Sequence, residues 1–309
     1  MLCLLAVNVA PATAQSALEF CSRPELQGLV DRAARSALGR FAATKLETNQ
    51  LAITLMDMRQ PDRPAWASFR GNVQIYPASV IKLFYLVAAH RWMEDGKLKD
   101  SEELRRAMKD MIVDSLNEAT GFIVDSLTGT TSGPELPTDE LEKWYDKRNA
   151  VNRYFASLGY KNINVNRKPW CEGPYGREMQ SVKLHKPDHR NWLTTEATAR
   201  LFTEITTGRA VSAERSRQMM ELLKRRPFEK DADKQSLEYT GAVLPQGAKL
   251  WSKAGWTSEV RHDAAYVEMP DGAKFVLVIF TASHSNEKEI VPFVAGEVVR
   301  EMSGVAVER

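Results

Sequence analysis

The sequence predicts an α+β fold, a sandwich in which an antiparallel sheet is built from both chain ends and flanked by helices, with an all-helical lobe inserted in between. Three observations predict it. Short runs rich in β-branched and aromatic residues gather towards the two ends of the chain. Helical periodicity dominates the middle, and each end also carries one amphipathic helix. Strands at both termini with helices between them favour one sheet closed by both ends.

The N-terminal part predicts a helix followed by a hairpin. Residues 23–41 place apolar side chains at i, i+3, i+4 and i+7 spacings, which is typical of an amphipathic helix. Leu51–Met58 and Ala65–Arg70 are short apolar runs of the strand type. The segment between them, 59–64, contains two prolines and predicts the turn that joins the two strands.

The middle of the chain predicts a helical lobe that spans about 79–224. Helical periodicity covers the five segments 79–94, 101–126, 138–158, 195–207 and 212–224. Stretches rich in Gly, Pro and Asn separate these segments, and no strand pair is expected among them.

The sheet signal returns in the last quarter of the chain. Strands are expected at 249–256, 262–269 and 274–282. Pro270–Asp271–Gly272 separates the last two, and its glycine suits a turn with positive φ. The final stretch, 286–302, has the periodicity of an amphipathic helix.

The first 14 residues predict a secretory signal, which leaves 15–309 as a single domain. Leu2–Ala10 is an apolar run, followed by a proline and the small residues 12–14, as in the apolar region and cleavage site of a signal peptide. The run is too short to span a bilayer, so no transmembrane segment is expected. A basic n-region is missing, and a buried or disordered apolar N-terminus is the alternative. The protein is therefore expected to be exported, either periplasmic or secreted.

Composition excludes several classes of function. The 309 residues hold 42 Lys and Arg against 40 Asp and Glu, a net charge of +2, which is too small for a nucleic-acid partner. Neither CxxC nor HExxH occurs, and Pro187 separates His185 from His189, so no metal site and no other cofactor is expected. Cys21 and Cys171 form either one disulfide or two free thiols, and their spacing does not decide between these states.

A serine and a lysine stand at the start of an apolar helix. The segment 76–82 joins a turn to this helix, so Ser79 lies at the helix start and Lys82 lies one turn later on the same face. A serine hydroxyl needs a base beside it to become a nucleophile, and a desolvated lysine can serve as that base. S-x-x-K alone is a weak signal. A second copy at Ser285–Lys288 is interpreted as a serine that caps the terminal helix.

Two further motifs follow in order. Ser115–Leu116–Asn117 is the only S-x-N in the chain, and Lys253–Ala254–Gly255 is the only lysine followed by a small residue and glycine. Together with Ser79 and Lys82 they resemble the S-x-x-K, S-D-N and K-T-G motifs of serine β-lactamases and penicillin-binding proteins. Segment 261–265 is similar to the arginine-containing strand of class A β-lactamases, and Thr194–Thr195 is similar to the threonine pair that closes their Ω-loop.

The resemblance runs from about residue 25 to 305 and implies a β-lactamase/transpeptidase-like fold. It also implies catalytic roles. Ser79 would be the acylated nucleophile, Lys82 would shuttle its proton, and Ser115 would pass a proton to the leaving nitrogen. The backbone N–H groups of Ser79 and Trp256 would form the oxyanion hole.

Four more residues receive substrate-binding roles from the same resemblance. Asn117 would orient the substrate amide, and Lys253 would act electrostatically on Ser115 and on the substrate carboxylate. Arg261 would help to hold that carboxylate. Gly255 is expected to be exposed, so that substrate can lie along the strand without meeting a side chain.

The chain also departs from the family pattern. Leu116 and Ala254 replace the Asp and Thr of the motifs. We expect this to leave the chemistry intact and to change the substrate preference. Only 36 positions separate Ser79 from Ser115, so the helical lobe is expected to be trimmed between them. The carboxylate that activates the deacylating water is Glu178, Glu172 or neither, and the spacing from Thr194–Thr195 favours Glu178.

The resemblance implies a class A-like β-lactamase that acts through an acyl-enzyme on Ser79. Its substrate would be a small-molecule β-lactam or a cell-wall peptide, and a monomer is expected. A D,D-peptidase or esterase of the same fold is one alternative. A catalytically inactive module that binds a peptide is another, from a different class of function.

Overall fold

The computed structural model describes residues 18–170, 173–184 and 190–303. The predicted signal at 1–14, Cys171 and Glu172 lie outside the described residues. The structure therefore does not test whether Cys21 and Cys171 form a disulfide or remain two thiols. No described cysteine pairs with Cys21, whose Sγ lies 3.9 Å from the carbonyl oxygen of Arg63.

A seven-stranded sheet forms the centre of the fold, in the order β1-β3-β2-β7-β6-β5-β4. All neighbouring strands are antiparallel except the pair β1 and β3. The N-terminal hairpin meets the C-terminal strands where Ile53 pairs with Ile279. The prediction of one sheet built from both chain ends is thus confirmed. The strands are β1 (Cys21–Ser22), β2 (Leu51–Asp57), β3 (Ala65–Phe69), β4 (Lys224–Arg225), β5 (Lys249–Trp256), β6 (Arg261–Glu268) and β7 (Lys274–Thr281).

Helices cover both faces of the sheet, and most of them belong to the inserted lobe. The α-helices are α1 (Pro24–Arg40), α2 (Lys82–Glu94), α3 (Glu102–Lys109), α4 (Asn117–Thr128), α5 (Thr138–Arg148), α6 (Ala150–Ser157), α7 (Gly176–Leu184), α8 (Thr195–Thr206), α9 (Ala213–Leu223), α10 (Lys234–Leu237) and α11 (Ile290–Met302). Short 3₁₀ turns are η1 (Ala42–Thr44), η2 (Thr48–Gln50), η3 (Ala78–Ile81) and η5 (Thr240–Val243), and η4 (Asp110–Asp114) is a π-helical turn.

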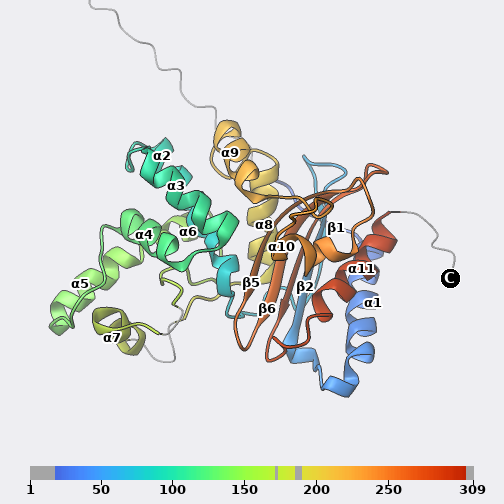
Figure 1. Ribbon diagram of the computed structural model, residues 1–309, viewed down its shortest axis with the longest axis horizontal. Coiled ribbons are helices and arrows are strands. Elements are labelled where there is room, and N and C mark those ends of the chain that lie inside the picture. The colour runs from blue at the N-terminus through green and yellow to red at the C-terminus, as the bar shows by residue number, and fades with distance from the viewer. Residues whose placement is uncertain (1–17, 171–172, 185–189, 304–309) are drawn as a thin grey trace, which may run out of the picture.

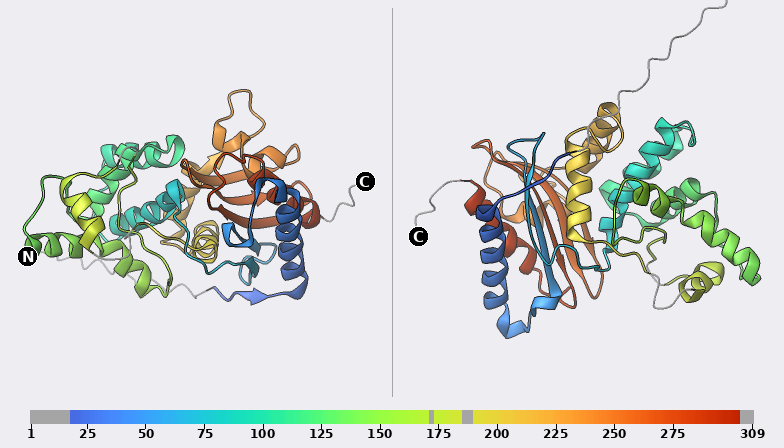
Figure 2. Two further views of the ribbon diagram at one scale, coloured as in Figure 1. Left: turned by 90° about the horizontal axis from the view of Figure 1, so that it is seen from below. Right: turned by 180° about the vertical axis from the view of Figure 1, so that it is seen from behind.

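Alternation of apolar side chains along the strands creates a core on each face of the sheet. On β7, Leu277 and Ile279 belong to the core beneath α1 and α11, whereas Val278 and Phe280 belong to the core beneath α2 and α8. Figures 1 and 2 show α1 and α11 on one side of the sheet and the helical lobe on the other. The segments that carry Ser79 and Ser115 belong to the lobe and Lys253 belongs to β5, so the three motifs come from both sides of the contact between lobe and sheet.

Several predicted boundaries differ from the structure. The predicted helix at 101–126 is interrupted by η4 and by Ser115, whose φ is +60°. The predicted helix at 138–158 is divided at Asn149 into α5 and α6. Helix α7 and the short strand β4 were not predicted. Because α11 begins at Ile290, Ser285 does not cap it as expected. The Ser285 hydroxyl instead donates a hydrogen bond to the carbonyl oxygen of Ser258.

Candidate active site

Ser79 lies in η3, the turn that leads into α2, and is half-buried. The residue before it, Ala78, has φ +46°, a left-handed conformation that a residue with a Cβ adopts at a cost. Strained backbone of this kind persists only where the surrounding structure imposes it. The sequence prediction that Ser79 starts a helix with Lys82 one turn later is confirmed.

Gly255 brings strand β5 against the backbone of the Ser79 turn. A Cβ atom at Gly255 would lie 2.8 Å from the carbonyl oxygen of Pro77 and 2.9 Å from the backbone nitrogen of Ser79. The expectation of an exposed glycine was wrong, because Gly255 is buried. Its missing side chain serves the close approach of two backbone segments, which places the N–H donors of Ser79 and Trp256 on adjacent stretches of chain.

Two buried lysines converge on the hydroxyl of Ser115. Lys82 Nζ lies 3.2 Å from Ser115 Oγ, 2.6 Å from the Ser115 carbonyl oxygen and 2.9 Å from Asn117 Oδ1. Lys253 Nζ lies 2.9 Å from the same Ser115 Oγ. Both lysines are fully buried. The structure therefore brings together the three motifs predicted from the sequence, with Ser115 Oγ between the two amines.

The conformation of Ser115 explains how its side chain reaches both lysines. The π-helical turn η4 ends at Ser115, and the left-handed residue then allows the chain to restart as α4 at Asn117. π-Helical turns are rare and occur frequently at functional sites. The irregular backbone points one hydroxyl into the interface between the lobe and the sheet.

Burial makes Lys253 unusually easy to deprotonate. Desolvation lowers the pKa of Lys253 well below its usual value, and the neighbouring charge of Lys82 lowers it further. Its amine is also within hydrogen-bond distance of the Gln235 side-chain oxygen, at 3.0 Å, and of the Ala254 carbonyl oxygen, at 2.9 Å. The protonated amine of Lys253 therefore loses its proton more readily than the amine of an exposed lysine does.

Gln235 and Arg225, which belong to no motif, connect the lobe to the sheet through hydrogen bonds. Gln235 Oε1 accepts a hydrogen bond from the backbone N–H of Ala254 at 3.0 Å, and its Nε2 donates to the carbonyl oxygen of Val113 at 3.1 Å. Arg225 donates to the carbonyl oxygens of Ile112 and Ser252, at 3.0 and 3.1 Å through Nη2. Each side chain thus links η4, which precedes Ser115, to the strand that carries Lys253.

His262 fixes the chain before the nucleophile. Its Nδ1 accepts a hydrogen bond from the backbone N–H of Thr281 at 3.1 Å, which assigns the proton to Nε2, and Nε2 lies 2.8 Å from the carbonyl oxygen of Tyr76. Burial lowers the pKa of His262 to about 4, so the ring is neutral at physiological pH. The ring therefore ties the segment before Ser79 to strand β6.

Arg261 points to a small polar cavity at the end of β5. Its Nη2 lies 2.7 Å from Oε2 of Glu238, and its guanidinium lies over the ring of Tyr239, 4.4 Å from the centroid. Trp256, 46% exposed, lines the same cavity of about 250 Å³. The predicted substrate-binding arginine is thus near the site but already contacts a carboxylate of its own chain.

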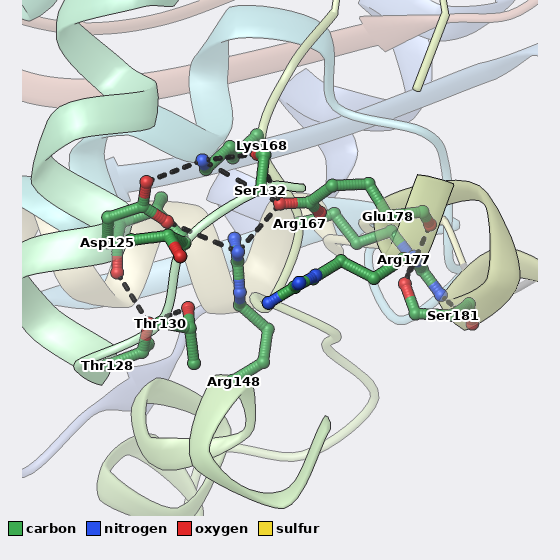
Figure 3. A network of polar contacts seen from close by, with 12 residues as sticks. Asp125, Thr128, Thr130, Ser132, Arg148, Arg167, Lys168, Arg177, Glu178 and Ser181 are labelled. Atoms are coloured by element: carbon green, nitrogen blue, oxygen red, sulfur yellow. Dashed lines mark hydrogen bonds and ion pairs between the residues drawn. The ribbon is translucent and has the colours of Figure 1, made fainter. Parts of the chain in front are cut away.

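Glu178 lies in a different environment from the one expected of a deacylating base. Its carboxylate is 2.7 Å from Arg148 Nη2, 2.9 Å from Ser132 Oγ and 3.7 Å from Lys168 Nζ, and the residue is 2% exposed. Figure 3 shows this network, which also includes Asp125. Among the contacts of the described residues, none joins Glu178 to the Ser115 cluster. Glu178 connects α7 to α5.

A larger cavity opens beside the site. It has a volume of about 510 Å³ and lies between the residues 167–170 and 173–174 on one side and the end of β5 on the other, with Tyr76 and Thr257 in its wall. The described residues contain no group of three or more His, Cys, Asp or Glu side chains placed to hold a metal ion. None of the described helices has the length and apolar character needed to cross a membrane.

Comparison with solved structures confirms the fold. The chain is similar to a β-lactamase from Sphaerobacter thermophilus, with 18% identity, a TM-score of 0.65 and coverage of 91% of this chain and 99% of that one. An acyl-enzyme complex of a PBP-A mutant with penicillin G gives 18% identity, a TM-score of 0.65 and coverage of 89% and 98%. The TLA-3 extended-spectrum β-lactamase gives 13% identity, a TM-score of 0.65 and coverage of 89% and 99%.

Comparison of the sequence itself gives two results. No curated protein matches the chain. The sequence model of the β-lactamase enzyme family matches residues 38–299, which include Ser79, Ser115, Lys253 and Arg261. The chain therefore belongs to the β-lactamase enzyme family and has the β-lactamase/transpeptidase-like fold of serine hydrolases of that type.

Proposed function

We propose that this protein opens β-lactams through an acyl-enzyme on Ser79, as a class A-like β-lactamase. One observation carries the proposal: two buried lysine amines meet the Ser115 hydroxyl beside the turn that bears Ser79. Lysines are rarely buried without a structural or chemical purpose. Three motifs far apart in the chain meet here, as proton transfer around a serine nucleophile requires.

Acylation begins with attack of Ser79 Oγ on the lactam carbonyl carbon. The Ser79 proton passes to the neutral amine of Lys82, and the oxyanion is stabilised by the N–H groups of Ser79 and Trp256. The carbon–nitrogen bond then breaks as the Ser115 hydroxyl gives its proton to the leaving nitrogen. Ser115 recovers a proton from a lysine ammonium. Water afterwards hydrolyses the ester and releases the opened product.

The hydrogen bonds of Ser115 suit it to the step in which the nitrogen leaves. A serine hydroxyl has two lone pairs and one proton. When Lys82 and Lys253 both donate to Ser115 Oγ, at 3.2 and 2.9 Å, the lone pairs are occupied and the hydroxyl proton is available for donation. The two cations also stabilise the negative charge that grows on this oxygen as its proton departs.

A second candidate function is a D,D-peptidase that β-lactams acylate without rapid release. It is supported by the position of Glu178, whose carboxylate is engaged by Arg148 rather than by the Ser115 cluster. A PBP-A mutant has been seen as an acyl-enzyme complex with penicillin G. The two candidates share acylation of Ser79 and differ in how fast the ester is hydrolysed.

Kinetics with a chromogenic cephalosporin, combined with intact-mass analysis, test both candidates. Multiple turnovers per enzyme support the β-lactamase, and a stoichiometric burst with a lasting adduct supports the D,D-peptidase. Ser79→Ala is the control and should give neither a burst nor an adduct. A wild-type protein that neither hydrolyses the cephalosporin nor carries an adduct after exposure to penicillin and cephalosporin would refute both, leaving the catalytically inactive peptide-binding module.

A further inference from the structure

The small cavity at the end of β5 is strongly cationic. Its wall includes Arg261, Lys234 and Lys288, and a single carboxylate, that of Glu238, faces these three cations. Arg261 is 5% exposed, whereas both lysines lie at the surface. A cavity with this excess of positive charge attracts a negatively charged group.

Glu238 supplies that negative group from within the chain. The hydrogen bond from Arg261 holds the pKa of Glu238 below its usual range, and the charges of Lys288 and Lys234 lower it further against the opposing effect of desolvation. The carboxylate is therefore ionised at neutral pH. Arg261 Nε is buried and has no hydrogen-bond partner among the described residues, so the guanidinium retains a donor that Glu238 does not satisfy.

The cavity shares part of its wall with the larger cavity and reaches the residue after Gly255. Thr257 and Ser258 line both this cavity and the larger one beside Tyr76. Trp256, also in the wall, directly follows Gly255, which packs against the backbone nitrogen of Ser79. A substrate that extends past Trp256 at the end of β5 would therefore come next to the cavity that Arg261 lines.

We propose that Glu238 determines substrate preference by occupying Arg261. A substrate carboxylate that enters this cavity has to displace the Glu238 carboxylate, whereas a substrate that is uncharged at this end does not. The site consequently favours neutral acyl donors, such as esters or amides without an adjacent carboxylate, more than it would with a neutral residue at position 238. This inference rests on the proposed function, because it assumes that acyl donors bind along β5.

Binding measurements without chemistry test the proposal. In the Ser79→Ala background, calorimetry gives the Kd of benzylpenicillin and of its methyl ester, with and without Glu238→Gln. We expect Glu238→Gln to tighten binding of the acid about five- to tenfold, as the loss of one partly exposed charged competitor predicts, and to change binding of the ester less than twofold. Glu289→Gln, an exposed carboxylate beside Lys288 and outside the cavity wall, controls for the change in net charge.

A double-variant cycle tests whether the tighter binding of the acid depends on the pair of Glu238 and Arg261. In an Arg261→Gln background, Glu238→Gln should bring no further gain for the acid. Equal effects on acid and ester, an equal effect of Glu289→Gln, or no detectable binding of either ligand would overturn the proposal. Failure of wild-type acylation while the Ser79→Ala variants still discriminate acid from ester would refute the proposed function alone.

Discussion

Lys253 Nζ and Ser115 Oγ lie 2.9 Å apart, although 138 positions separate the two residues in the chain. The contact joins the sheet to the lobe at the point where the π-helical turn η4 ends. Because Lys253 is fully buried and its pKa is lowered, the contact places a readily deprotonated amine on the hydroxyl that we assign to proton donation. The first two predictions follow from this pair.

Removal of the Ser115 hydroxyl should slow acylation of Ser79 by roughly 10²- to 10⁴-fold, the usual contribution of a general acid. Ser115→Ala and Ser115→Gly should be slowed alike, because both lack the hydroxyl while glycine relieves the cost of φ +60°. Quench-flow mass spectrometry with a penicillin gives the rates. Ser126→Ala removes a hydroxyl from the neighbouring helix α4 and should leave them unchanged. Acylation of Ser115→Gly at the wild-type rate would exclude the hydroxyl from the reaction.

Replacement of Gln235 by Glu should move the alkaline limb of the pH–rate profile to higher pH. The change places a carboxylate where Gln235 Oε1 now lies, 3.0 Å from Lys253 Nζ, and a nearby negative charge raises the pKa of an amine. Lys253 would then keep its proton, and its stabilising charge, to higher pH. The measurement is kcat/KM for a chromogenic cephalosporin across the pH range.

The same substitution also separates two explanations. The Glu carboxylate cannot donate to the Val113 carbonyl oxygen, so a loss of stability of about 1 to 2 kcal/mol is expected in addition. Gln235→Leu shares that loss but adds no charge, so its alkaline limb should not move upward. An upward shift in both variants would show that the shift does not come from the new charge on Lys253.

Gly255→Ala should lower kcat strongly while the protein remains folded. The new Cβ would meet the Pro77 carbonyl oxygen at 2.8 Å and the Ser79 nitrogen at 2.9 Å, so β5 and the nucleophile turn have to separate. Overpacking of this kind costs about 1 to 3 kcal/mol. Gly39→Ala, in helix α1 with no atom within 4 Å of the added carbon, should stabilise by about 0.5 to 1 kcal/mol with full activity. Denaturant unfolding and steady-state kinetics compare the two, and a fully active Gly255→Ala would contradict the close packing.

The parts of the fold that the sequence predicted are those in which local patterns carry the information. Apolar runs place the hairpin and β5 to β7, and Pro270–Asp271–Gly272 places a turn whose glycine has φ +91°. The interruption at Ser115 could not be predicted in this way, because the apolar periodicity continues through 101–126. Contacts with Lys82 and Lys253, both remote in the chain, accompany the irregular backbone there.

The site shows the same division. The order of Ser79, Ser115 and Lys253 in the chain was enough to expect that they meet. Gln235 and Arg225 belong to no motif, and their importance arises only when the lobe packs on the sheet. The expectation for Glu178 relied on counting positions, which does not reveal that α7 packs against α5 and that Arg148 of α5 pairs with this carboxylate.

Breaking the pair of Glu178 and Arg148 should destabilise the protein. Both side chains are at most 3% exposed, and their closest atoms are 2.7 Å apart. Glu178→Gln leaves Arg148 with Asp125 alone, at 3.2 Å, and Arg148→Met leaves Glu178 with Ser132 and, at 3.7 Å, Lys168. Each variant should therefore cost less than the roughly 3 to 5 kcal/mol of a buried charge left with no partner at all. The double variant should cost less than the sum of the two, because it removes both charges together. Denaturant unfolding measures all three.

The same variants decide which role Glu178 has. If it anchors α7, the two single variants should affect the lifetime of the acyl-enzyme alike, because each disconnects α7 from α5. If Glu178 activates the deacylating water, Glu178→Gln should accumulate acyl-enzyme while Arg148→Met continues to release product. Because the structure gives the Glu178 carboxylate to Arg148, Ser132 and Lys168, we expect the first result. Intact-mass time courses after a short exposure to penicillin, at a temperature where both variants remain folded, distinguish the two outcomes.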